Sequence, residues 1–66
     1  MVFKLQVLAM SGEWITVLES KDSAQVSEQY TTYTVGYPND TFRIIDGQYH
    51  RYIPDPTNAW KLTVQR

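Results

Sequence analysis

The sequence predicts an α+β fold, with an antiparallel sheet of four to five strands that carries one helix on a face. Three observations lead to this fold: alternating apolar and polar residues at both ends of the chain, one segment with helical spacing between them, and an Asp46-Gly47 turn pair. The expected order of elements is β-β-α-β-β-β. With 66 residues, the chain is long enough for one hydrophobic core only, so we expect a single domain spanning residues 1–66.

The first two strands are expected to form a hairpin. Residues 2–10 alternate in polarity at their start, with Phe3, Leu5 and Val7 on one face. Ser11-Gly12 is a turn pair, and the β-branched and aromatic residues of 13–19 favour a second strand.

The second strand is expected to be apolar on both sides. Alternation predicts Ile15 and Val17 on one side and Trp14 and Leu18 on the other. One helix can cover only one side of the sheet, so Trp14, Ile15 and Val17 are candidates for a protein interface. A chain this small, without disulfides or metal, often gains stability by self-association, so we expect a homo-oligomer.

The helix is expected to begin near Asp22, which suits an N-cap, with Gln25 three residues later completing a capping box. Val26, Tyr30 and Tyr33 follow at the spacing of one helical face and are interpreted as core residues. Several threonines weaken the last turn, and Gly36 is expected to close the helix as a C-cap.

The second half is expected to return the chain to the sheet. A turn over residues 37–40 precedes strands at 41–45 and 48–53, which flank Asp46-Gly47 as a hairpin. The proline-containing residues 54–58 are interpreted as a stiff connector, because proline lacks the donor that a central strand needs. A last strand is expected from Trp60 to the end of the chain.

Composition excludes several classes of function. The net charge of −1 argues against a general binder of the phosphate backbone, and the absence of cysteine removes zinc ribbons and thiol catalysis. The acidic residues are scattered and the three glycines lie in separate turns, so no metal, no cofactor and no phosphate-cradling loop is expected. No apolar run approaches the length of a membrane span, which favours a soluble, cytoplasmic protein without a membrane partner.

His50 is the one histidine, and the residues around it form no pattern of nucleophile, base and orienting acid. We therefore interpret His50 as a solvent-facing strand residue and expect the protein not to be an enzyme. A small enzyme that uses His50 as acid or base is kept as an alternative.

The candidate ligand-binding residues lie in the second half of the chain. Residues 36–66 carry four basic and three acidic side chains, a balance of 4 − 3 = +1, whereas the first half has −2. Cations and aromatic rings interleave there, a combination that binds phosphates and bases. The candidates for phosphate contacts are Arg43, Arg51 and Lys61, and those for base stacking are Tyr49, Tyr52 and Trp60.

The segments Trp14-Ile15-Thr16-Val17, Asp22 to Tyr30 and Phe42-Arg43-Ile44-Ile45 together resemble the layout of the small RNA-polymerase inhibitors of podophages, over roughly residues 3 to 46. The chain departs from that layout in its C-terminal hairpin and its Trp60 strand. It also resembles phage counter-defence sponges, which oligomerise and bury cyclic nucleotides between subunits. The resemblance implies a phage-encoded host-takeover or counter-defence protein in the cytoplasm of an infected bacterium.

The resulting expectation is a non-enzymatic binding protein that inhibits a host or anti-phage defence factor. It would act by protein contact or by sequestering a nucleotide signal, such as a cyclic nucleotide, between subunits. The alternative is a single-stranded nucleic-acid-binding module that stacks bases on Tyr49 and Tyr52, against which the net negative charge counts.

Overall fold

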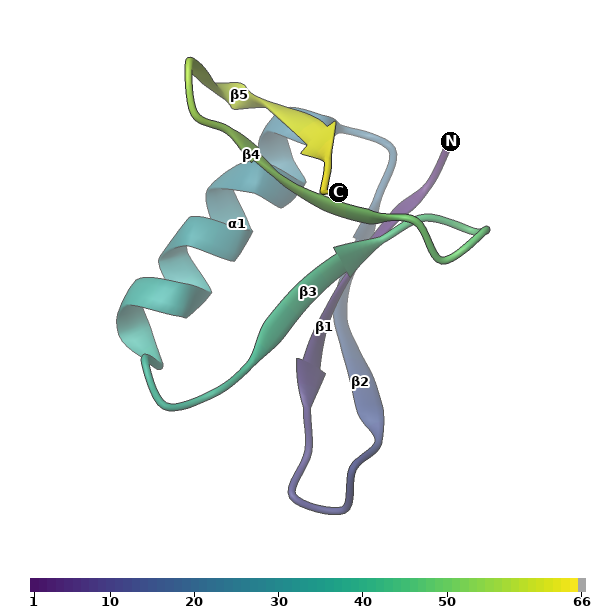
Figure 1. Ribbon diagram of the computed structural model, residues 1–66, viewed down its shortest axis with the longest axis vertical. Helices are drawn as coiled ribbons and strands as arrows, with labels where there is room; N and C mark the ends of the chain where they lie inside the picture. The colour runs from purple at the N-terminus through teal and green to yellow at the C-terminus, as the bar shows by residue number, and fades with distance from the viewer. Residues whose placement is uncertain (66) are drawn as a thin grey trace.

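A computed structural model describes residues 1–65; Arg66 lies outside the described residues. Five antiparallel strands form one sheet, and a single helix packs against one face of it (Figure 1). The elements are β1 (Phe3–Leu8), β2 (Trp14–Ser20), α1 (Ser23–Gly36), β3 (Phe42–Ile45), β4 (Arg51–Asp55) and β5 (Asn58–Val64). The strands lie in the order β2-β1-β3-β4-β5. The predicted α+β class and order of elements are confirmed.

The core lies between α1 and the three central strands. Leu5 of β1, Val26 of α1 and Ile44 of β3 are fully buried. The ring of Phe3 meets Tyr52 edge to face, with centroids 5.1 Å apart. Fully burying an aliphatic side chain contributes about 1.5–3 kcal/mol, so these residues supply much of the stability of so small a chain.

The helix begins at the predicted N-cap, Asp22, whose carboxylate accepts hydrogen bonds from the backbone N–H groups of Ala24 and Gln25 at 3.0 and 3.3 Å. The predicted capping box is replaced by a relay through Ser20. The Ser20 hydroxyl accepts from the backbone N–H of Asp22 at 3.0 Å and donates to Gln25 Oε1 at 2.7 Å. The N-cap prediction is therefore confirmed, and the reciprocal Gln25 contact is not formed.

The end of the helix differs from the prediction. Gly36 is the last helical residue, and Tyr37 caps the helix by donating its N–H to the carbonyl of Tyr33 at 2.9 Å. The hydroxyls of Thr31 and Thr32 donate to the carbonyls four residues earlier, at 3.1 and 3.0 Å. These bonds follow the helical backbone, and α1 continues through both threonines.

A β-bulge in β2 changes which residues share a face. Leu5 pairs with Leu18, whereas the next residue, Gln6, pairs with Thr16, so Val17 is an extra residue in β2. Leu18 therefore faces α1, while Trp14 lies on the sheet face away from α1, here named the open face. The predicted common side for Trp14 and Leu18 is wrong, because strict alternation assumes a strand without a bulge.

The connection between β3 and β4 is longer than a two-residue turn. β3 and β4 pair only at Ile44 with Tyr52 and Ile45 with Arg51, which leaves residues 46–50 as a loop. The predicted strand at 48–53 therefore begins three residues later. The physical reason is a buried carboxylate, Asp46, which accepts hydrogen bonds from the backbone N–H groups of Gln48 and His50 and so holds these residues in a loop.

Residues 54–58 are not the predicted connector. Pro54 and Asp55 belong to β4, and Asn58 begins β5 after a turn over Pro56 and Thr57. The ladder between β3 and β4 ends at Tyr52, so beyond it β4 pairs with β5 alone. A proline is tolerated in such a position because no strand on that side needs its missing N–H.

Candidate functional site

The best-organised polar group on the open face is the guanidinium of Arg43 on β3. Its Nε donates to Gln6 Oε1 at 2.7 Å, and Gln6 in turn donates through Nε2 to Thr16 Oγ1 at 3.1 Å. The guanidinium carbon lies 4.1 Å from the ring centroid of Trp14, a cation–π contact. Neighbouring strands thus hold Arg43 by one hydrogen bond and one stacking contact, which limits its rotamers.

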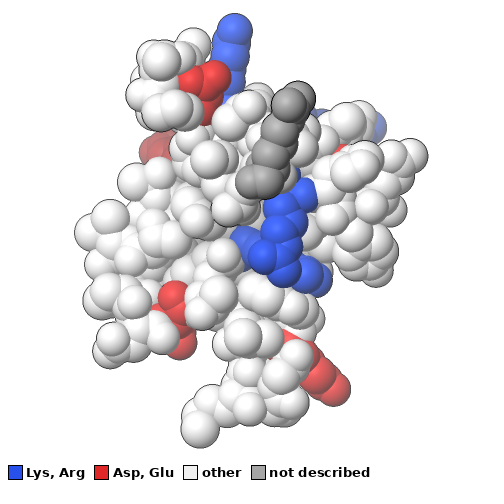
Figure 2. All heavy atoms as spheres, viewed as in Figure 1, with Lys and Arg blue, Asp and Glu red and all other residues white. Residues whose placement is uncertain are grey.

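A second cation, Arg51 on β4, lies near Arg43. Burial and the positive charge of Arg51 lower the pKa of Arg43, while Tyr49 acts in the opposite direction. Among residues 1–65, neither arginine forms an ion pair with a carboxylate. Figure 2 shows Lys and Arg side chains gathered near the middle of the molecule in that view, surrounded mostly by uncharged side chains. The two guanidinium groups therefore form a site where an anion would relieve mutual repulsion.

The loop beside this site is organised by Asp46, whose side chain is 5% exposed. One carboxylate oxygen accepts from the backbone N–H groups of Gln48 and His50 at 2.8 and 3.0 Å. The other oxygen accepts from the Tyr52 hydroxyl at 2.8 Å and lies 3.1 Å from His50 Nδ1. Burial acts to raise the pKa of Asp46, but these hydrogen bonds outweigh it and lower the pKa to about 2. Asp46 is thus a fixed negative anchor for the loop.

Tyr49 is the exposed aromatic residue of this loop. Its φ is 62°, in the left-handed region, and its side chain is 73% exposed. A bulky residue in this conformation is held there at a cost of about 1–2 kcal/mol, and the hydrogen bonds to Asp46 on either side of Tyr49 offset that cost. The ring is therefore presented to solvent and not packed in the core.

Tyr52 does not join the candidate site. Its ring is 9% exposed, and its hydroxyl is engaged by Asp46, which together with burial raises the pKa of Tyr52. The ring belongs to the core, so the predicted role of Tyr52 in base stacking does not fit the structure. The sequence pattern could not reveal that Tyr52 is buried, because the partner of its hydroxyl, Asp46, lies at the other end of the loop.

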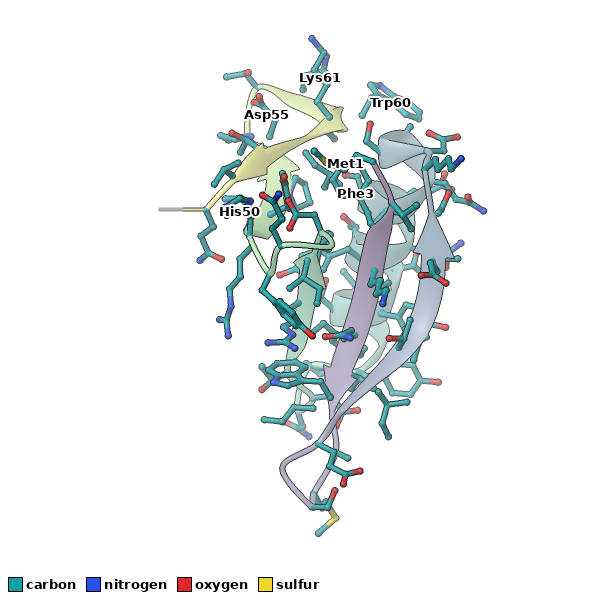
Figure 3. All side chains as sticks on the ribbon, turned by 90° about the vertical axis from the view of Figure 1, so that its right-hand side faces the viewer. Met1, Phe3, His50, Asp55, Trp60 and Lys61 are labelled. Atoms are coloured by element: carbon teal, nitrogen blue, oxygen red, sulfur yellow. The ribbon has the colours of Figure 1, made fainter. Side chains whose placement is uncertain are left out.

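Trp60 and Lys61 lie on the edge strand β5, which β4 separates from β3 and Arg43. Figure 3 shows them diverging from β5, with Trp60 on the side of α1. Lys61 lies on the other side, where its charge contributes to lowering the pKa of Asp55, an effect due first to the hydrogen bonds from Thr57. The six predicted ligand residues therefore separate, and the structure brings together Arg43, Tyr49 and Arg51.

The three predicted interface residues also separate. Trp14 is half-buried beneath Arg43 on the open face, whereas Ile15 and Val17 are exposed on the side of α1. Val17 borders a shallow cleft of about 160 Å³ beside Tyr33 and Phe42. No single surface of residues 14–17 therefore presents all three side chains.

Sequence reasoning missed two residues that build the site. Gln6 is 8% exposed although it stands in a strand flanked by apolar residues, and a polar residue in such a run is the signal that could have identified it. Asp46 was expected only as a turn former, and its buried partner Tyr52 is not visible from local pattern. Both residues act by positioning Arg43 and Tyr49.

Within residues 1–65, no group of three His, Cys, Asp or Glu side chains is arranged to hold a metal ion. In the same part of the chain, no helix has the length and apolar character needed to cross a membrane. His50 contacts Asp46 and lies in the loop, not on the predicted strand.

Comparisons of the chain with protein-family models, with curated proteins and with solved structures found no match. The class defined here is therefore a structural one: a five-stranded antiparallel sheet with one helix on a face.

Proposed function

We propose that the protein is a non-enzymatic binding protein that holds a nucleotide on its open face, over Arg43, Arg51 and Tyr49. The observation that carries this proposal is the fixed guanidinium of Arg43, bonded to Gln6 and stacked on Trp14, without a carboxylate partner among residues 1–65. A preorganised guanidinium loses little entropy on binding and matches the geometry of phosphate.

The groups of the site that are free to contact a nucleotide are two guanidinium groups and one aromatic ring. Arg43 spends its Nε–H on Gln6, so its terminal N–H groups can donate two parallel bonds to a phosphate. Arg51 adds a second positive charge next to it. The exposed ring of Tyr49 can stack on a base, a contact that contributes about 1–3 kcal/mol.

The cellular role that we propose is sequestration of a nucleotide signal, such as a cyclic nucleotide, as in the phage counter-defence proteins that the chain resembles. One open face covers only one side of such a ligand. A second copy of the chain that covers the other side would bury the nucleotide between subunits, so ligand binding and homo-oligomerisation are proposed together.

The test is isothermal titration of the purified protein with cyclic dinucleotides, cyclic trinucleotides and linear mononucleotides, with light scattering before and after. We expect heat with at least one phosphate-bearing ligand, and a loss of affinity of tenfold or more in Arg43→Met and Arg51→Gln. Lys21→Gln, which removes an exposed cation elsewhere, is the matched control. Absence of heat with every nucleotide would refute the proposal.

The open-face position of Arg43, Arg51 and Tyr49 also favours a second candidate, a single-stranded nucleic-acid-binding module. In that case oligothymidylate would bind, and its affinity would fall steeply as salt is raised, because counterions are released from the strand. Binding of oligothymidylate without binding of cyclic nucleotides would decide for this candidate.

A further inference from the structure

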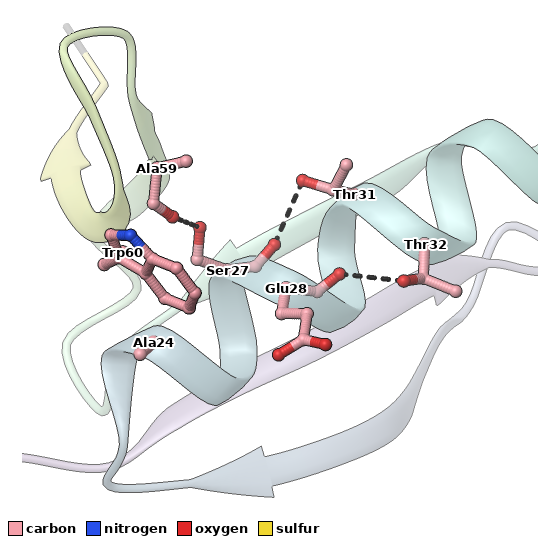
Figure 4. Close-up of a pocket in the computed structure, with 7 residues that line it drawn as sticks. All are labelled: Ala24, Ser27, Glu28, Thr31, Thr32, Ala59 and Trp60. Carbon is pink, nitrogen blue, oxygen red and sulfur yellow. Dashed lines mark hydrogen bonds between the residues drawn. The ribbon is translucent and has the colours of Figure 1, made fainter.

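A concave feature separate from the open face lies where α1 meets β5. It is a groove of about 340 Å³ between residues 24–32 of α1 and the start of β5 (Figure 4). Its size is within the range of small-ligand pockets, about 300–1,000 Å³. Its lining includes Ala24, Glu28, Thr31, Thr32, Ala59 and Trp60.

The shape of this groove is fixed by a partly buried hydrogen bond. The hydroxyl of Ser27, which is 1% exposed, donates to the carbonyl of Ala59 at 2.6 Å and ties β5 to α1. Trp60 follows directly after this attachment point, and its side chain is 68% exposed. The indole of Trp60 lines one wall of the groove, and most of its surface is open to solvent.

The walls of the groove are largely apolar despite the threonines. Thr31 and Thr32 spend their hydroxyl protons on the carbonyls of Ser27 and Glu28 within α1 (Figure 4). Their methyl groups, the two alanine side chains and the indole remain as contact surface. A ligand of this groove must therefore offer an apolar body.

Glu28 supplies the one charged side chain of the lining. It is exposed and forms no ion pair with any cation among residues 1–65. The indole face carries the negative end of the ring quadrupole, so both groups favour a positive charge and repel phosphate. Lys61, the neighbour of Trp60, points away from the groove (Figure 3).

From this combination of apolar walls, an exposed indole and an unpaired carboxylate, we propose that the groove binds a small alkylammonium ligand. The charged group would lie over Trp60 on the side of Glu28, with its methyl groups against the alanines and threonines. This proposal concerns a site separate from the open face and does not depend on the nucleotide proposal.

The experiment compares choline with 3,3-dimethyl-1-butanol, which has the same shape without the charge. Each is titrated into the ¹⁵N- and ¹³C-labelled protein while the indole N–H of Trp60 and the methyls of Ala24 and Thr31 are followed by NMR. We expect choline to shift these signals in a saturable manner, with millimolar affinity, and the neutral alcohol to bind at least about threefold more weakly.

Two variants test whether Glu28 and Trp60 bind choline. Glu28→Gln should weaken choline binding about threefold to tenfold, and Trp60→Leu should remove it, with far-UV circular dichroism reporting that the fold is kept. Glu13→Gln, which removes an exposed acid in the β1–β2 turn, is the matched control and should leave binding unchanged.

Equal binding of choline and the alcohol, unchanged binding in Glu28→Gln, or no saturable shift with choline would each overturn the proposal. So would binding of a lysine-containing peptide without binding of choline, because that result would assign the groove to a protein partner.

Discussion

Replacing Arg43 by Met tests whether the anchored guanidinium also stabilises the sheet. The variant loses a charged hydrogen bond to Gln6, which contributes about 1.5–3 kcal/mol, and a cation–π contact with Trp14 of about 0.5–1 kcal/mol. Methionine keeps an unbranched chain over the Trp14 ring and recovers about 1 kcal/mol of apolar and sulfur–aromatic contact. We therefore expect the free energy of unfolding to fall by about 1–3 kcal/mol.

The assay is equilibrium urea unfolding followed by circular dichroism. A small protein has an m-value of about 1 kcal/mol/M, so the midpoint should move down by about 1–3 M. The double variant Arg43→Met with Gln6→Leu should recover at least half of the loss, because replacing both partners removes the orphaned acceptor. Arg51→Met is a control, because the Arg51 side chain has no hydrogen-bond partner among residues 1–65, and it should change stability by less than about 0.5 kcal/mol. An unchanged midpoint in Arg43→Met, or no recovery in the double variant, would refute the reasoning.

Three further predictions concern the Asp46 loop. Because the pKa of Asp46 is lowered from 3.8 to about 2 on folding, its contribution to stability is fully present above about pH 4 and is lost as the pH falls towards 2. Asp46→Asn should flatten that part of the stability–pH curve, and an equally steep curve in the variant would contradict the assignment. Tyr52→Phe should move the carboxyl pKa of Asp46 towards 3.8 in a ¹³C NMR titration and lower the free energy of unfolding by about 1 kcal/mol. Tyr49→Gly should stabilise the protein by about 0.5–1 kcal/mol in urea unfolding, because glycine adopts the left-handed φ without strain, while nucleotide affinity falls. A lower midpoint for this variant would show that the Tyr49 ring contributes more than its strain costs.

Local pattern predicted the elements but not the exceptions within them. The Asp22 cap and the helical stripe headed by Val26 depend on residues three or four apart, so the sequence carries their signal directly. The bulge at Val17 depends on which residue of β1 lies opposite, and a strand considered alone holds no such information.

The candidate site was predictable to the same limited extent. Arg43, Arg51 and Tyr49 were identified as a cation–aromatic combination, and the structure places these three together. Tyr52 and Trp60 were grouped with them because they too are aromatic residues of the second half of the chain. In the structure, Tyr52 is buried against Asp46, and Trp60 lies beside α1. Separation of this kind is set by tertiary contacts, which residue type alone does not encode.

The order of strands has a consequence for how the chain folds. β1 and β2 form one hairpin, β3 to β5 form a meander, and the one strand pairing that joins the two sets of described strands is that of β1 with β3. That junction joins Leu5 to Ile44, residues far apart in the chain, so its formation must overcome the loop-closure entropy of α1 and its flanking turns. We expect each half to gain local structure quickly and the docking of β3 on β1 to limit the folding rate. A chain emerging from the ribosome would therefore hold one edge of β1 unpaired until β3, which ends at Ile45, has been made.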